Sequence, residues 1–318
     1  MTLLGYRNPA RRLLNTARGL LRRRILPSSG RSCFVIGHRG AARLEVENTI
    51  PSFARALELG ANAVETDVCV TIDGHFVLWH DCHPDEKVAL VRQAGAEKDY
   101  LYKPDAPPAD SGWRRPVPEL TLEELRAHYG YVPCEEKGGT KRRAGIALLD
   151  DLFAWSKEED RLELVCLDVK LGEKESAAAR ELASAVREGR RSGRIREDLA
   201  VAFLCPLEET LVAVLTESRR ESLGKNVWIF GDFELPGALD FAKRFGISCV
   251  SFGVSRRFWA GFRSELEDVL AARAEGHIDR VIVWTINEEK RLRELVDLGV
   301  DGILTDEPAL LRSIVGRK

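Results

Sequence analysis

From residue 33 onward, short apolar runs alternate with amphipathic stretches, and this alternation restricts the fold more than any other feature of the chain. Such alternation predicts βα units that pair into a parallel sheet. The first helix is expected to begin at Asn48 or Thr49, and the last clear one to be capped by Asn287 and to end at Gly299. The expected strands are residues 33–38, 63–69, 76–80, 162–169, 200–205, 227–231, 247–252, 281–286 and 301–305.

Nine expected strands are one too many for an eight-stranded barrel. Only 12 residues separate Asp67 from His80, and they include the turn at Asp73-Gly74. A parallel crossover normally takes a dozen or more residues and usually contains a helix. We therefore expect the chain to return without a helix, so that 76–80 is not a regular barrel strand.

Residues 81–118 interrupt the alternation of apolar runs and amphipathic stretches. They contain six of the 13 prolines, many charges and little periodicity. Long segments of this kind are usually functional or mobile. We predict an insertion after the third strand, over the mouth of the barrel, with a short helix near residues 120–130.

The composition excludes some classes of protein. A net charge of −2 argues against a nucleic-acid partner, which would require a basic surface. The seven cysteines show no paired spacing, so we expect free thiols in a reducing compartment, and hence a cytoplasmic protein. The sequence gives no indication of the oligomeric state.

Residues 1–32 differ from the domain expected over 33–318, because they carry eight arginines and no acidic residue. Leucines recur among the arginines at helical spacing. A basic amphipathic helix of this kind can contact an anionic membrane surface peripherally or act as a targeting segment. A solvated arm is the alternative, and the sequence favours neither.

Two carboxylates, Glu65 and Asp67, lie two residues apart in an expected strand and therefore on the same face of it. The apolar neighbours Ala63, Val64 and Val68 indicate burial. Buried carboxylates side by side are costly unless a cation neutralises them, and hard divalent cations prefer oxygen ligands. An exposed acidic strand face is the alternative.

Further polar side chains end other expected strands. His38 and His80 both close apolar runs, and in a parallel barrel this end of the strands holds the active site. Asp168 and Lys170 are again two apart, and would complete the cation site and hold an anionic oxygen, unless they form a simple salt bridge. Trp284 either walls the pocket or belongs to the barrel core.

Together these groups suit a phosphate diester. A divalent cation with Arg39 and Lys170 would make a positive pocket. Two histidines suit an acid–base relay, in which one removes a proton from the attacking oxygen and the other protonates the leaving alkoxide. The cation would polarise the phosphoryl oxygen.

Several motifs resemble those of the glycerophosphodiester phosphodiesterase family. The order and spacing fit from about residue 34 to 312, although residues 171–280 match loosely. The matching motifs are GHRGA (37–41), ENTIPSFARALELGA (47–61), ETDV (65–68), DGHFVLWHD (73–81), TLEEL (121–125) and VWTINEEKRLRELVDLGVDGILTDEP (283–308).

The resemblance implies an irregular (β/α)8 TIM barrel and metal-dependent hydrolysis of a glycerophosphodiester to glycerol 3-phosphate and an alcohol, with Mg²⁺ or Ca²⁺. Where the family commonly has a glutamate as third ligand, this chain has Asp168, which resembles the related sphingomyelinase D-like and lysophospholipase D branch. Carried over position by position, the implied roles are acid–base pair His38 and His80, phosphate contact Arg39, and metal ligands Glu65, Asp67 and Asp168.

Two other hypotheses compete with this one. The first is a lysophospholipase D, in which residues 1–32 and the insertion guide a lipid and the substrate's own hydroxyl attacks phosphorus to give a cyclic phosphate. The second is a non-catalytic barrel that binds phospholipid head groups. The presence of both histidines and of the Glu65–Asp67 pair disfavours the second.

Overall fold

The computed structural model describes residues 33–97, 99–134, 144–234, 237–253 and 259–316. The arm over residues 1–32 lies outside the described residues, so its contact with a membrane stays a prediction. Among the helices that are described, none is both long enough and apolar enough to cross a membrane. The cytoplasmic location also stays a prediction.

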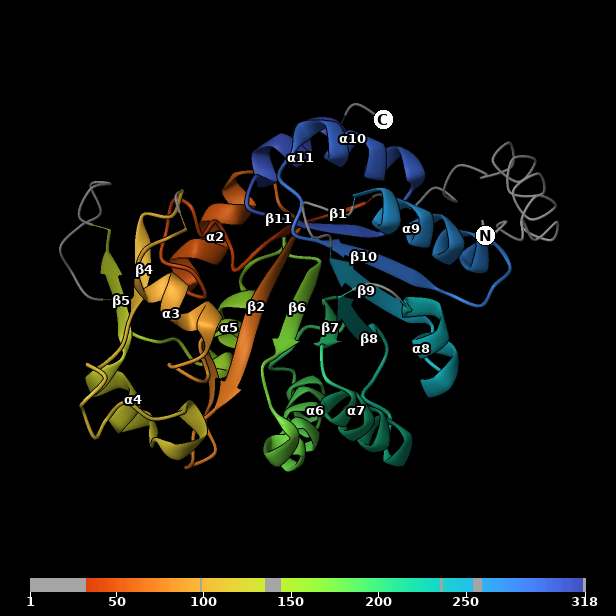
Figure 1. The fold of residues 1–318 in the computed structure, drawn as a ribbon. Helices are drawn as coiled ribbons and strands as arrows, with labels where there is room; N and C mark the ends of the chain where they lie inside the picture. Colours follow the sequence, from red (N-terminus) through yellow and green to blue (C-terminus); the bar gives the residue numbers. More distant parts are fainter. Residues whose placement is uncertain (1–32, 98, 135–143, 235–236, 254–258, 317–318) are drawn as a thin grey trace, which may run out of the picture.

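Eight parallel strands close into a barrel, in the order β1-β11-β10-β9-β8-β7-β6-β2, and pairing of β1 with β2 completes the ring (Figure 1). The predicted irregular (β/α)8 TIM barrel is confirmed. The barrel strands are β1 (Phe34–Gly37), β2 (Ala63–Val70), β6 (Leu164–Val169), β7 (Ala200–Cys205), β8 (Val227–Glu234), β9 (Cys249–Gly253), β10 (Arg280–Trp284) and β11 (Gly302–Thr305).

The ninth expected strand, β3 (Phe76–Leu78), lies outside the barrel. It pairs antiparallel with β2, with Val68 opposite Leu78. A turn at Gly74, whose φ of 84° suits glycine, returns the chain without a helix. The prediction that this segment is not a regular barrel strand is confirmed.

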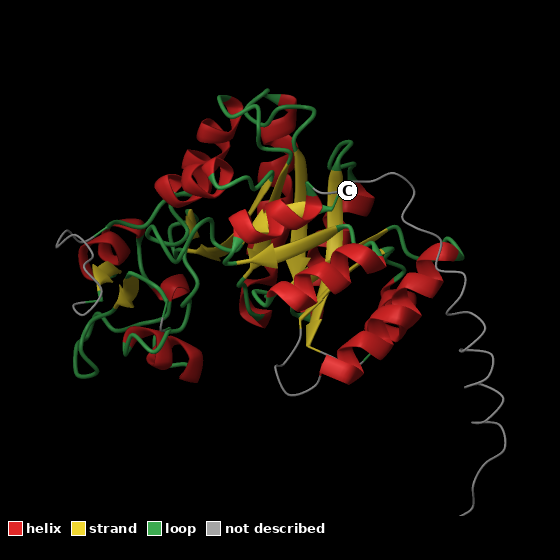
Figure 2. Ribbon diagram, turned by 90° about the horizontal axis from the view of Figure 1, so that it is seen from above, coloured by secondary structure: helices red, strands yellow, loops and turns green. Residues whose placement is uncertain are grey.

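Helices surround the strands when the barrel is seen from above (Figure 2). They are α2 (Ile50–Glu58), α5 (Leu149–Lys157), α6 (Ser176–Arg191), α7 (Glu208–Arg220), α8 (Ala238–Phe245), α9 (Trp259–Ala274), α10 (Glu289–Leu298) and α11 (Pro308–Val315), with a 3₁₀ turn η3 (Glu173–Glu175).

The helix ends test three predictions. Thr49 is the N-cap of α2, and its side chain accepts a hydrogen bond from the backbone of Ser52. The expected end of α10 at Gly299 is confirmed by a left-handed residue with φ 78°. The expected Asn287 cap is wrong: Glu288 occupies the N-cap position, and the Asn287 side chain bonds to Asp306 instead.

Period-2 alternation separates two apolar cores. Outward-facing strand residues pack against the helices, while inward-facing ones fill the barrel with side chains such as Ile36, Leu164, Phe230 and Ile282. The interior is therefore solid below the mouth, and polar side chains are left for the carboxyl ends of the strands, where barrel active sites form.

The predicted insertion after the third strand has its own core around Trp79, Tyr129 and Tyr131. The expected short helix is α4, which begins with a capping box between Thr121 and Glu124. The insertion extends past the predicted limit at residue 118 and includes a small antiparallel sheet that was not predicted. Its elements are α3 (Lys87–Gln93), β4 (Tyr102–Asp105), η1 (Val117–Glu119), α4 (Leu122–His128) and β5 (Gly130–Pro133).

The prediction that all seven cysteines are free thiols is wrong. Cys69 on β2 forms a disulfide with Cys82, which follows β3. The β2–β3 pairing brings the two residues together, with their Cα atoms 6.1 Å apart, although their spacing of 13 residues is not diagnostic. The other five cysteines are buried and form no disulfide in the described part of the chain: Cys33, Cys134, Cys166, Cys205 and Cys249.

Thiol titration of the denatured chain tests this pairing. Without reductant we expect five reactive thiols, and after reduction seven, because only the Cys69–Cys82 pair is oxidised. A Cys69→Ser, Cys82→Ser double variant should give five under both conditions. Seven thiols in the unreduced native sequence would contradict the disulfide.

Candidate active site

The turn after β1 places the first site residues. Arg39 and Gly40 both adopt left-handed backbone, with φ of 52° and 85°. A Cβ at Gly40 would lie 2.5 to 2.7 Å from atoms of Ser52 on α2, so only glycine fits there. This close approach directs the Arg39 backbone N–H to the Glu65 carboxylate, at 2.9 Å.

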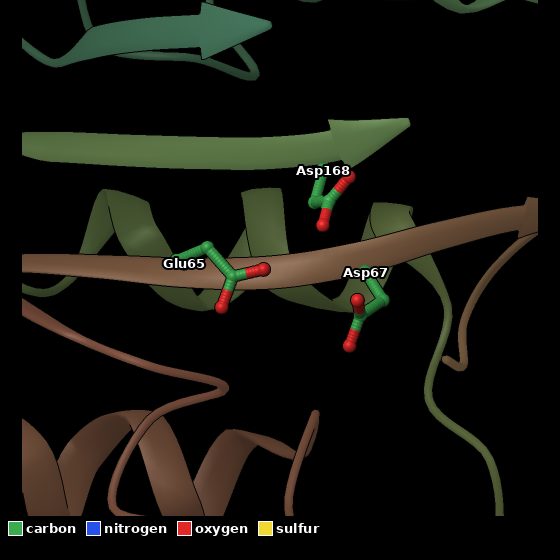
Figure 3. Close-up of side chains that lie close together, drawn as sticks. All are labelled: Glu65, Asp67 and Asp168. Atoms are coloured by element: carbon green, nitrogen blue, oxygen red, sulfur yellow. The ribbon is translucent and has the colours of Figure 1, made fainter. Parts of the chain in front are cut away.

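Three carboxylates converge at the mouth of the barrel (Figure 3). Glu65 and Asp67 project from β2, and Asp168 lies opposite Asp67 on β6. One ligand atom from each lies within 4.8 Å of the others. Glu65 and Asp67 are each only 1% exposed, and Asp168 Oδ1 is buried with no hydrogen-bond partner among the described residues.

The electrostatics of this carboxylate cluster suit a cation. Burial and the charge of Asp67 raise the pKa of Glu65 to about 8. Burial also raises the pKa of Asp168, although Lys170 opposes the shift. Three carboxylates, one of which has a buried oxygen without a hydrogen-bond partner among the described residues, fit a hard divalent cation.

Arg39 and Lys170 border the carboxylate cluster. Arg39 Nε lies 3.0 Å from Asp67, and Lys170 Nζ lies 2.6 Å from Asp168 and 3.5 Å from Asp67. Burial opposes ionisation of Asp67, but Arg39 and then His80 and Lys170 lower its pKa overall. Both predicted phosphate-binding cations are therefore at the cluster, where they pair with its carboxylates.

Each predicted catalytic histidine is oriented by a carboxylate. His38 Nδ1 donates to Asp306 at 2.8 Å, and His80 Nδ1 donates to Asp81 at 2.6 Å. The two side chains are 17% and 16% exposed. Because Nδ1 is engaged in both rings, Nε2 of each is the nitrogen available to a substrate.

The two histidines have opposite pKa shifts. Burial and Arg39 lower the pKa of His38, but the ion pair and hydrogen bond with Asp306 outweigh them, and its pKa is raised. Burial and Arg39 likewise lower the pKa of His80, and here Asp67 does not compensate, so its pKa falls well below the usual value. Protonation is therefore easier at His38 than at His80.

Trp284 packs its indole on the barrel interior, and its Nε1 donates to Asp232 on β8. A Cβ at Gly253 would lie 2.5 to 2.7 Å from the ring, so the glycine makes room for the indole. Asp232 connects Trp284 to the carboxylate cluster, because the charge of Asp168 acts on Asp232. The role of Trp284 as a wall of the pocket stays a prediction.

The analysis of the sequence missed several residues that support the site. Asn48, with φ 56°, donates to Asp67, and Glu47 accepts from Arg39 and Arg92. A signal existed for four of these supporting residues, because Glu47 and Asn48 stand in the motif ENTIPSFARALELGA, Asp81 in DGHFVLWHD and Asp306 in the motif that ends ILTDEP. No local pattern distinguishes Arg92, whose importance depends on the partners it meets.

The comparisons with known proteins agree with this geometry. The model of the glycerophosphoryl diester phosphodiesterase family matches residues 38–310. The chain belongs to that family. It is a phosphodiesterase that hydrolyses glycerophosphodiesters.

Individual relatives cover most of the chain. A glycerophosphodiester phosphodiesterase from Caldanaerobacter subterraneus is 25% identical and aligns with 88% of this chain and 97% of its own. A rat lysophospholipase D is also 25% identical, over 88% of this chain and 85% of its own. The structure of an Oleispira antarctica phosphodiesterase in complex with the product sn-glycerol-3-phosphate matches with a TM-score of 0.62 and 19% identity, over 90% and 97% of the two chains.

Metal addition tests the carboxylate cluster. We expect Mg²⁺ or Ca²⁺ to raise the melting temperature of the phosphodiesterase, because a ligand that binds only the folded state stabilises it by about 2.7 kcal/mol at a hundred times its Kd. Glu65→Gln should abolish the increase. The matched control is Glu163→Gln, a carboxamide change at an exposed position before β6. An equal increase in both variants would place the cation elsewhere.

Proposed function

We propose that this phosphodiesterase cleaves glycerophosphodiesters to glycerol 3-phosphate and an alcohol with His38 as general acid and His80 as general base. Glu65, Asp67 and Asp168 would hold Mg²⁺ or Ca²⁺, which when bound supplies a Lewis acid for the phosphoryl oxygen. The observation that carries the proposal is the opposite pKa shift of two histidines at one carboxylate cluster.

The proton transfers follow from the two protonation states. Neutral His80 takes a proton at Nε2 from the attacking water as the new P–O bond forms. Protonated His38 donates its Nε2 proton to the alkoxide oxygen as the old P–O bond breaks. Each carboxylate partner at Nδ1 holds its ring in the required orientation, and Asp306 also stabilises the imidazolium form of His38.

Arg39 and Lys170 would contact the phosphate oxygens. Both are charged side chains that border the carboxylate cluster, and Arg39 is 7% exposed. Fixed cations in a site shielded from water stabilise developing negative charge more strongly than in solution. The Oleispira antarctica phosphodiesterase, which has the same fold, binds sn-glycerol-3-phosphate, and this supports a glycerol-containing substrate.

Removing either imidazole tests the relay. His38→Ala and His80→Ala should each lower kcat for glycerophosphocholine by on the order of 10²- to 10⁴-fold, the usual contribution of a general acid or base. The melting temperature should change little, since both rings are partly exposed and their partners keep other hydrogen bonds. Full activity in either variant would remove that histidine from the mechanism.

The pH profile tests which histidine is the acid. Since activity requires charged His38 and neutral His80, kcat/KM should fall above the raised pKa of His38 and below the lowered pKa of His80. Asp306→Asn removes the charge that raises the pKa of His38, so the alkaline limb should move to lower pH while the acid limb stays. Asp160→Asn, at a fully exposed carboxylate, serves as control. Movement of the acid limb instead would reverse the two roles.

A second candidate function is lysophospholipase D, with peripheral membrane contact through residues 1–32. The rat relative supports it. The insertion helix α3 supports it too, because Val88, Leu90 and Val91 are 57%, 47% and 48% exposed. The same helix sends Arg92 to Asp81 beside His80, so an acyl chain on α3 would lie near the reaction centre.

A substrate comparison decides between the two candidates. If deacylated diesters are the substrate, the double variant Val88→Ser, Val91→Ser should have the same ratio of turnover rates for glycerophosphocholine and lysophosphatidylcholine as the native protein. A selective loss for the lysolipid, at least about fivefold for two lost apolar contacts, would favour the lysophospholipase D. ³¹P NMR of the products separates hydrolysis from release of a cyclic phosphate.

A further inference from the structure

Asp232 is a buried carboxylate that the mechanism leaves unused. It is 6% exposed and projects from β8 into the upper part of the barrel. Trp284 Nε1 donates a hydrogen bond to it. Among the described residues no Lys, Arg or His forms an ion pair with it, although the charge of Lys170 acts on it from a distance. Four buried carboxylates at the same end each have an ion-pair partner: Glu47, Asp67, Asp81 and Asp306.

Two further polar groups act on it. Ser251 on β9 stands opposite Asp232 in the strand register, is fully buried, and its hydroxyl is near enough to lower the pKa of Asp232. The charge of Asp168 raises that pKa. A buried carboxylate that faces the barrel mouth without an ion-pair partner among the described residues can accept a hydrogen bond from a ligand there.

The geometry favours a hydroxyl donor over an ammonium group. The indole N–H of Trp284 donates in the plane of the ring, so Asp232 lies at the ring edge, whereas a quaternary ammonium binds over the ring face. Burial and Asp168 raise the pKa of Asp232 to about 7. A hydroxyl both donates and accepts, and therefore pairs with either form of this carboxyl group.

We propose that Asp232, held in place by Trp284 and assisted by Ser251, binds a hydroxyl group of the glycerol half of the substrate. This inference rests on the proposed function and specifies which part of the diester the barrel recognises. Every glycerophosphodiester shares the glycerol, and side chains on rigid strands suit a constant group. The insertion, which lies outside the barrel, would then contact the alcohol half of the diester, which differs from one substrate to another.

Product binding separates this role from catalysis. The dissociation constants of sn-glycerol 3-phosphate, propyl phosphate and phosphoethanolamine would be measured by calorimetry with the metal-loaded protein. Propyl phosphate lacks both glycerol hydroxyls but keeps the phosphate. Asp232→Leu should raise the dissociation constant of glycerol 3-phosphate by about 10- to 100-fold, as expected for loss of a hydrogen bond to a carboxylate. It should change the dissociation constant of propyl phosphate by less than about twofold.

Two further variants keep the test decisive. Asp232→Asn preserves an acceptor for Trp284 and should give an intermediate loss, even if Asp232→Leu does not fold. Ser251→Ala should give a smaller loss in the same direction. Equally weakened binding of glycerol 3-phosphate and propyl phosphate would overturn the inference. Selectively weakened binding of phosphoethanolamine would show that the carboxylate binds an ammonium group instead. Failure of the native protein to bind any of the three would refute the proposed function itself.

Discussion

The contacts of Arg39 are the constraint on which the site depends. Its backbone N–H binds Glu65, its Nε lies beside Asp67, and its Nη1 donates to Glu47 before α2. One residue thus joins the turn after β1, the strand β2 that carries Glu65 and Asp67, and the start of the first helix. Arg39 keeps its left-handed backbone because moving it would break these buried contacts together. Breaking one buried ion pair costs about 3–5 kcal/mol. The carboxylates can therefore be held close together before any cation binds.

The insertion is part of the same charge network. Arg92 on α3 is 3% exposed and binds Asp81, Glu97 and Glu47, while the Tyr131 hydroxyl on β5 also donates to Glu47. The insertion is thus connected to His80 through Asp81 and to Arg39 through Glu47. Changes elsewhere in the insertion would have to preserve these contacts, which is consistent with its separate core around Trp79 and Tyr129.

The barrel and the carboxylate cluster could be predicted because local periodicity determines them. Two carboxylates two apart in an apolar strand share a face wherever that strand lies, and strand ends in a parallel barrel meet at one edge. Other features depend on a partner from a distant segment. Asn287 has the sequence context of a helix cap, but Asp306 on the neighbouring strand end takes its side chain. Cys69 and Cys82 become neighbours only through the β2–β3 pairing, and the hydrogen bond from Trp284 to Asp232 joins two strands that are far apart in the sequence.

The difference between the two histidines shows the same dependence. His38 and His80 both end apolar runs, and both donate from Nδ1 to a carboxylate, so the local sequence treats them alike. What lies behind each carboxylate differs. Asp306 accepts from Tyr100 and Asn287 and has Arg43 only at 4.0 Å, whereas Asp81 has Arg92 at 3.0 Å and a pKa raised to about 6 by burial. Arg92 and Lys170 further disfavour an imidazolium at His80. The proposed division into acid and base therefore originates in the charges around each ring, because Asp306 raises the pKa of His38 whereas Arg92 and Lys170 lower that of His80.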